Sequence, residues 1–167
     1  MQKKATVLAA QVVTVTRVNS VYENDFAITL VLIPNNTDII NIISDAAFTA
    51  KAERVDTGYN VTWLLTNSFH ELKDVRVEGD LYGNFTWDES SVAVPAGKIT
   101  FDPKTKKLTW TIPKLVTSVD TAALKFPLNF AKINPTQKDL SGPITLTAID
   151  AETGGTISLS VPAIKAQ

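Results

Sequence analysis

Hydrophobic and polar residues alternate along most of this chain, so its dominant period is two. In residues 59–66, Tyr59, Val61 and Trp63 fall on one face and Asn60 and Thr62 on the other. Such alternation, rich in β-branched and aromatic residues, is typical of a strand with one face in a core. The same pattern predicts strands at residues 13–16, 26–32, 75–78, 99–101, 108–112, 124–130, 144–148 and 157–161.

Turn-forming sequences separate these strands. Residues 102–106 (DPKTK) place Pro at the second position of a type I turn, and residues 150–155 (DAETGG) end in glycines that tolerate positive φ. Short strands with frequent turns predict an antiparallel sandwich or barrel. Residues 38–52 leave two interpretations open: a short helix capped by Asp38, or a strand at residues 39–43.

The two ends of the chain resemble each other. Residues 13–34 and residues 144–162 each read as strand, acidic polar turn, strand and Pro. Either two hairpins look alike by chance, or the chain holds the last hairpin of one repeat followed by a whole repeat. We therefore expect residues 1–46 to be an N-terminal hairpin or the tail of a preceding repeat, and residues 47–167 to be the sandwich domain. Met1 is then best explained as added to a segment of a longer protein, although it also suits a chain that starts there.

The order of motifs from residue 48 to residue 162 carries a resemblance. The motifs are YNVTW at 59–63, LKDVRV at 72–77, ITFDPKTKKLTWTI at 99–112, FPLNF at 126–130 and ITLTAID at 144–150. This order resembles the Ig-like repeat modules of large bacterial surface proteins, although the Leu-Pro of that family is replaced here by Leu81-Tyr82. The resemblance implies an all-β fold, an Ig-like antiparallel β-sandwich with an extra N-terminal β-hairpin. It also implies a non-enzymatic structural module, extracellular at the cell surface, in a stalk, adhesin or surface layer. Its partners would be adjacent repeats or neighbouring copies.

Composition narrows the possible functions. The 167 residues carry 16 basic and 17 acidic side chains, so no net field draws the chain to nucleic acid or an anionic membrane. No apolar run approaches the roughly 20 residues of a membrane helix. The chain has no cysteine and one histidine, which excludes thiolate chemistry and multi-histidine metal centres. These absences argue against an enzyme and against a cofactor.

Two polar candidates for chemistry remain. His70 lies between two predicted strands with only Ser68 and Glu71 near it in sequence, so we expect a solvent-facing loop histidine that can be replaced without loss. The chain lacks the Asp-rich run of a calcium loop. We expect no metal, and if a cation binds anywhere, Asp150 and Glu152 are the first choice because their turn contains glycine.

The tryptophans suggest a second possible function beside the structural one. Trp63 and Trp110 belong to the apolar faces of alternating strands and are expected in the core. Trp87 lies outside such a pattern, and with Tyr82 it is the candidate for a glycan contact, since flat aromatic rings stack on sugars. The alternative is therefore a carbohydrate-binding β-sandwich module that uses exposed aromatics. Three N-x-S/T triplets occur, and we attribute them to the Thr- and Asn-rich composition.

Overall fold

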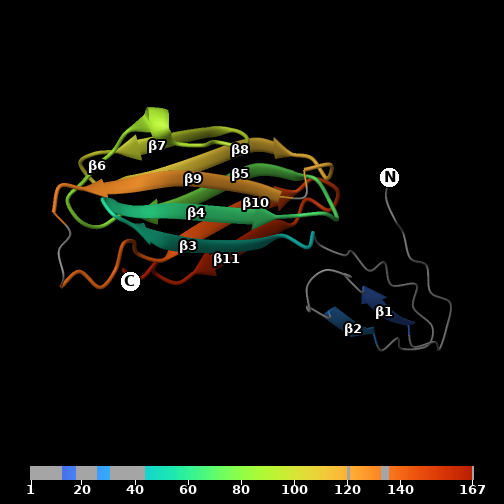
Figure 1. Cartoon of the computed structure of the whole chain (residues 1–167). Helices are drawn as coiled ribbons and strands as arrows, with labels where there is room; N and C mark the ends of the chain where they lie inside the picture. Colours follow the sequence, from blue (N-terminus) through green and yellow to red (C-terminus); the bar gives the residue numbers. More distant parts are fainter. Residues whose placement is uncertain (1–12, 18–25, 31–43, 120, 133–135, 167) are drawn as a thin grey trace. The chain divides into compact units, whose positions relative to one another are not determined.

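The computed structural model describes residues 13–17, 26–30, 44–119, 121–132 and 136–166 (Figure 1). The chain divides into two compact units, Met1–Ile42 and Ile43–Gln167. In the first unit, β1 (Val13–Arg17) and β2 (Phe26–Leu30) pair as antiparallel strands, which confirms the two strands expected there. Whether this unit extends the sandwich or belongs to a preceding repeat stays a prediction.

The second unit is a sandwich of two antiparallel sheets, which confirms the all-β prediction. The first sheet has the order β3 (Ala47–Val55), β4 (Gly58–Thr66), β9 (Thr121–Phe130) and β6 (Phe85–Thr86). The second has the order β11 (Thr156–Val161), β10 (Ile144–Asp150), β5 (Leu72–Asp80), β8 (Lys107–Leu115) and β7 (Lys98–Asp102). In the described part the only helical segment is one 3₁₀ turn, η1 (Glu89–Ser91).

β3 corrects the interpretation of residues 38–52 as a helix. From residue 47 onward this segment is a strand, and it pairs residue by residue with β4 from Ala47↔Thr66 to Val55↔Gly58. Residues 38–43, including the alternative strand at 39–43, lie outside the described residues. The Ala- and Lys-containing sequence of β3 favours a helix in isolation, but pairing with β4 overrides that local propensity.

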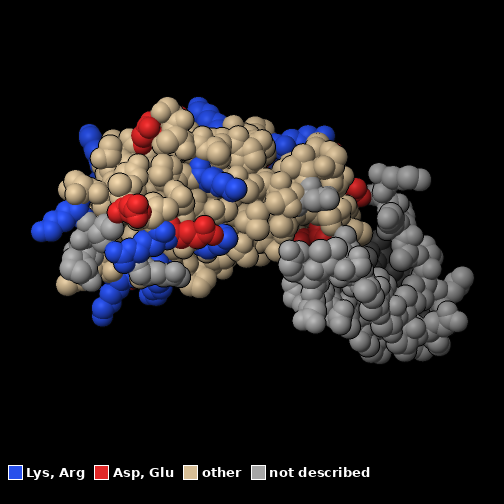
Figure 2. Space-filling model, in the orientation of Figure 1, with Lys and Arg blue, Asp and Glu red and all other residues tan. Residues whose placement is uncertain are grey.

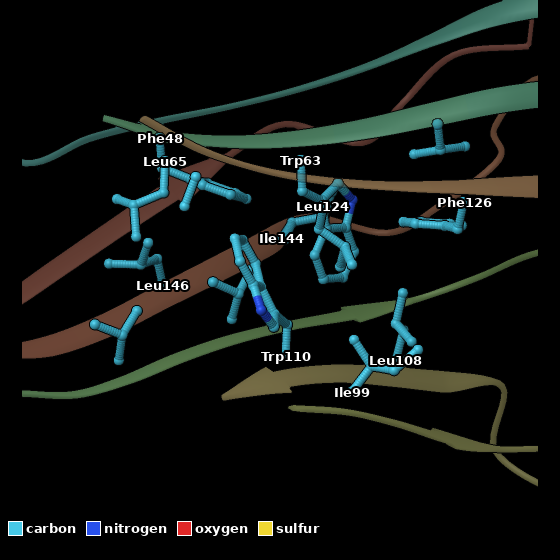
Figure 3. Close-up of a cluster of buried hydrophobic side chains, with 14 of the residues drawn as sticks. Phe48, Trp63, Leu65, Ile99, Leu108, Trp110, Leu124, Phe126, Ile144 and Leu146 are labelled. Atoms are coloured by element: carbon cyan, nitrogen blue, oxygen red, sulfur yellow. The ribbon is translucent and has the colours of Figure 1, made fainter. Parts of the chain in front are cut away.

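The core lies between the two sheets and is built around the two tryptophans expected there (Figure 3). Trp63 and Trp110 are both fully buried, which confirms the prediction. Trp63 meets Phe48 and Phe126 edge to face, at ring-centre distances of 6.4 and 5.6 Å. Such contacts add to the burial of large apolar rings, and here they pack the inner faces of β3, β4 and β9 together.

The strands define two ends of the sandwich. At the N-terminal end, Ala47 pairs with Thr66, Leu72 pairs with Asp150, and Ile149 pairs with Thr156. The start of β3, where the chain enters the sandwich, and the start of β11 therefore lie at the same end. β11 ends at the opposite end, where Val161 pairs with Ile144, and we call this the C-terminal end (Figure 1).

Candidate functional site

A buried carboxylate organises the N-terminal end of the sandwich. Asp150 ends β10, is completely buried, and accepts four hydrogen bonds. Its Oδ1 accepts from the backbone N–H groups of Glu152 and Thr153, at 2.9 and 3.0 Å. Its Oδ2 accepts from the backbone N–H of Ser44 at 2.8 Å and lies 2.7 Å from Nδ1 of His70. One side chain thus joins a turn, a loop and the segment that leads into β3.

The environment of Asp150 favours its charged form. Burial by itself would raise the pKa of this carboxyl group. Hydrogen bonds from the Thr153 amide, the His70 ring, and the amides of Glu152 and Ser44 outweigh that effect and lower the pKa to about 2. The carboxylate is therefore ionised at neutral pH, and we assign the Nδ1 proton of His70 to the bond between the two side chains.

Asn67 extends this network. The residue is 2% exposed, and its Nδ2 donates to the backbone carbonyl of His70 at 2.6 Å. The hydroxyl of Ser44 donates to Oδ1 of Asn67. Asn67 therefore links the backbone at His70 to Ser44, which lies just before β3. Buried polar groups that are fully hydrogen-bonded specify one arrangement of the chain.

Asp45 makes a second connection at the same place. Its Oδ1 accepts from the backbone N–H groups of Ser68 and Phe69, both at 2.9 Å. Its Oδ2 accepts from the hydroxyl of Ser68 at 2.8 Å. Two successive residues at the start of the sandwich, Ser44 and Asp45, are thus bound to the loop between β4 and β5. We call Ser44, Asp45, Asn67, His70 and Asp150 the N-terminal anchor.

The structure overturns the expectation that His70 faces solvent. The residue is 8% exposed, its ring lies against that of Phe69 at a ring-centre distance of 4.4 Å, and its Nδ1 is bound to Asp150. The partner that buries it stands 80 positions later in the chain, so local sequence did not reveal it. Ser44 and Asp45 were missed for the same reason: their partners lie 23 to 106 positions away and no local motif marks them. Asn67 was also missed, because no local motif marks its bonds to His70 and to Ser44.

The His70–Asp150 pair has the geometry of two members of a catalytic triad, but not the third. A triad places a nucleophile at Nε2 of the histidine. Here a carboxylate oxygen of Glu152 lies 3.6 Å from Nε2. The hydroxyls of Ser44 and Ser68 donate to Asn67 and Asp45 instead. This arrangement suits holding the chain in place rather than nucleophilic catalysis.

The same contacts correct the choice of Asp150 and Glu152 as a first cation site. The four N–H groups that point at Asp150 use the acceptor positions of both oxygens, and N–H donors repel a cation. Within the described residues, no group of three or more His, Asp or Glu side chains is placed to hold a metal ion. The turn-forming role of Asp150 is supported, because it accepts from the amides of the turn that follows β10.

A second set of contacts fixes the last residues at the C-terminal end. The backbone N–H of Ile164 donates to the buried hydroxyl of Ser141 at 3.1 Å, and that hydroxyl donates to Gly142 O. Three further contacts join the same two segments: Leu140 N–H to Ile164 O at 2.7 Å, Ala166 N–H to Lys138 O at 2.9 Å, and the Lys165–Asp139 ion pair at 2.7 Å. Both places where the chain joins the sandwich are thus bound to it by several hydrogen bonds.

The two aromatic candidates for a glycan contact differ in their surroundings. Tyr82 is 43% exposed. Trp87 is half-buried, and its ring stacks on Phe101 at a ring-centre distance of 4.6 Å and lies 5.7 Å from the ring of Phe126. One face of the Trp87 ring is therefore covered by the protein itself. A glycan contact at these residues stays a prediction.

Charge on the surface follows the balanced composition. On the face drawn in Figure 2, side chains of both signs are interspersed. The formal net charge of the whole chain is −1. Among the described residues, no helix is long and apolar enough to span a membrane.

Comparison with known proteins gives structural likenesses only. No protein-family model matches the chain, and no curated protein matches its sequence. One similar solved structure is that of three N-terminal domains of a type V pilus tip protein from Porphyromonas gingivalis. The TM-score is 0.48 at 16% identity, over 62% of this chain and 22% of that one.

Two further solved structures are similar to part of the chain. A GH20 exo-β-N-acetylglucosaminidase from Vibrio harveyi matches with a TM-score of 0.48 at 13% identity, over 74% of this chain and 19% of that one. The Mu homology domain of Fcho1 from Danio rerio, bound to an Eps15 peptide, matches with a TM-score of 0.43 at 12% identity. That match covers 71% of this chain and 43% of the other. The chain thus spans about a fifth of the first two structures. Values this low support no conclusion about function.

Proposed function

We propose that this chain is a non-enzymatic structural module of a bacterial cell-surface protein, of the stalk, adhesin or surface-layer type, which carries tension from one end to the other. The order of sequence motifs supports the assignment to bacterial surface proteins, and from it we infer a location outside the cell. The proposal of a load-bearing role rests on the geometry of the sandwich.

The observation that carries this proposal is the direction of the first and last strands. β3 and β11 both start at the N-terminal end, and the chain leaves the sandwich at the other end (Figure 1). Tension on the two ends therefore pulls β3 and β11 along their own lengths and in opposite senses. Such a pull loads all hydrogen bonds between β3 and β4, and between β10 and β11, at the same time. A pull across the strands would break those bonds one after another.

The anchors at the two ends fit the same role. A force applied before Ser44 meets the contacts of Asp45 and Asp150 before it reaches the ladder of β3. At the other end, Ile164 is bound to both Ser141 and Leu140. Hydrogen bonds to charged groups contribute about 1.5–3 kcal/mol each, so the N-terminal anchor resists the first step of extension.

Single-molecule force spectroscopy on the full chain, held at its two termini, tests the load-bearing role. We expect the sandwich to unfold in one event that lengthens the chain by roughly 400 Å, from about 3.3–3.6 Å per extended residue. Asp45→Ala removes the acceptors of three hydrogen bonds and should lower the unfolding force. Glu89→Ala, an equal charge change at an exposed site, is the matched control and should leave it unchanged. Gradual extension without a distinct event, or equal effects of both variants, would contradict the proposal.

The location is tested separately. An antibody raised against this chain should label intact cells of the source organism without permeabilisation. Labelling that requires lysis would refute the surface assignment while leaving the mechanical measurement valid.

A further inference from the structure

The outer edge of β3 is the longest unpaired strand edge that the structure describes. β3 has nine residues, whereas the other outer strands of the sandwich, β6, β7 and β11, have two, five and six. Among the described residues, β4 is the only strand that pairs with β3. An edge strand presents unpaired N–H and C=O groups that another extended chain can complete.

A shallow apolar groove runs along the same edge. Its volume is about 420 Å³, and it lies between β3 and the residues that follow β11. Its lining combines the apolar residues Ala50, Ala52, Val161, Pro162, Ala163 and Ile164 with Thr49, Lys51 and Lys165. Ala50 and Ala52 face the core but are too short to close the space between the sheets at this side. A strand added to β3 would cover this groove.

The charges of Lys51 and Glu53 indicate what the added strand is. Lys51 and Glu53 lie two positions apart on the outer face, with side chains 68% and 69% exposed, and form an ion pair at 2.9 Å. Two opposite charges spaced two residues apart make a strand self-complementary. When such a strand pairs antiparallel with a copy of itself about the residue between them, each charge lies opposite its counterion.

We propose that a second copy of this chain pairs its β3 with this β3, antiparallel and centred on Ala52. Lys51 then lies opposite Glu53 of the partner subunit, and Glu53 lies opposite Lys51 of the partner subunit. The contact is an isologous twofold interface. It joins the two four-stranded sheets into one continuous sheet. On the groove side, Ala52 lies opposite Ala52 of the partner subunit, and Ala50 lies opposite Arg54 of the partner subunit.

The register follows from the pleat and from the charges. If the partner strand slips by one residue, its outer-face side chains lie on the side that faces the core. Only registers that keep the outer faces of both strands on the same side of the sheet are therefore allowed. Centring on residue 51 would set Lys51 against itself, and centring on residue 53 would set Glu53 against itself. The register centred on Ala52 is the one that pairs both charges favourably. This pairing does not depend on the load-bearing role, so the two can fail separately.

Because the chain has no cysteine, a disulfide reports this register directly. In Ala52→Cys the two introduced thiols face each other across the twofold axis, within the 4.4–6.8 Å Cα separation that a disulfide needs. In Ala50→Cys, the matched control, they are four residues apart along the strands, about 14 Å, and cannot bond. We expect mild oxidation of the full chain to give a covalent dimer with Ala52→Cys and not with Ala50→Cys. Equal crosslinking of both, or of neither, would overturn the proposed register.

Charge exchange at Lys51 and Glu53 tests the same contact without introducing cysteine. Lys51→Glu and Glu53→Lys each create two like-charge contacts at the interface, and the double variant restores both pairs. By sedimentation velocity over a range of concentrations, we expect each single variant to raise the dimer dissociation constant about 30-fold and the double variant to return it near the wild-type value. Both side chains are exposed, so the fold is retained, as circular dichroism would verify. A wild-type chain that stays monomeric at all concentrations, or a dimer that ignores these exchanges, would overturn the proposal.

Discussion

Replacing Asp150 by Asn isolates the role of the buried carboxylate in the N-terminal anchor. The substitution preserves the size of the side chain but removes its charge. An Asn side chain offers one acceptor oxygen and one N–H₂ group, so two of the four N–H donors around position 150 would face another donor. The variant therefore loses charge-assisted hydrogen bonds and leaves buried donors without an acceptor.

The pKa of Asp150 sets the size of the effect. The folded pKa of about 2 lies below the ordinary value of 3.8, and this difference corresponds to about 2–3 kcal/mol of stability. Because the pKa is lowered on folding, this contribution is complete above pH 3.8 and is lost as the pH falls toward 2. With unsatisfied donors added, we expect Asp150→Asn to lower the free energy of unfolding by about 3 kcal/mol at pH 6.

Urea unfolding followed by tryptophan fluorescence, repeated between pH 2 and pH 6, measures this difference. The gap between the wild-type chain and Asp150→Asn should be largest at pH 6 and should shrink below pH 4. Asp139→Asn is the control, since that carboxylate forms an ion pair with the exposed Lys165 and should contribute less than about 1 kcal/mol. A loss below 1 kcal/mol for Asp150→Asn, or a gap that does not change with pH, would refute the reasoning about the anchor.

Other substitutions test the core, the loop and the surface. Truncating Trp63 or Trp110 to Ala should cost about 3–5 kcal/mol in denaturant melts, as for large buried aromatics, and a cost under 1 kcal/mol would contradict their burial. His70→Ala should destabilise the chain by about 1–3 kcal/mol in the same assay, because the buried carboxylate of Asp150 loses the His70 ring as a donor. An unchanged unfolding midpoint would show that the loop does not need the ring. If Tyr82 and Trp87 contact a glycan, titration with polysaccharide should quench tryptophan fluorescence, and the quenching should disappear in Tyr82→Ala; no quenching by any polysaccharide would exclude that contact.

The strands of the core could be predicted from the sequence because their alternation is local. Residues 59–66 and 124–130 carry large apolar side chains at every second position, and they form β4 and β9 of one sheet. β3 was missed because its inward positions include Ala50 and Ala52, which leave no strong alternation and have high helix propensity. The feature that hid this strand from the sequence is also the one that leaves its edge groove open.

Of the candidate site, only the turn at residues 150–155 could be predicted from the sequence. The DAETGG sequence at residues 150–155 indicated a tight return, and the side chain of Asp150 does accept from the amides of that turn. The other half of its role depends on Ser44 and His70, which are 106 and 80 positions away. Contacts between residues so far apart in the sequence follow from the packing of the two sheets. They could not be predicted from the spacing of residues or from the composition.

The direction of pulling tests the central claim most directly. With handles at the two termini, force acts along β3 and β11. With handles at Ser118→Cys and Glu152→Cys, two exposed positions at the N-terminal end, force acts across the strands of the same folded unit. If the module is built to carry tension, the end-to-end pull should need a clearly higher unfolding force than the transverse pull in the same cysteine variant. Equal forces in the two directions, or a higher force in the transverse one, would contradict the account.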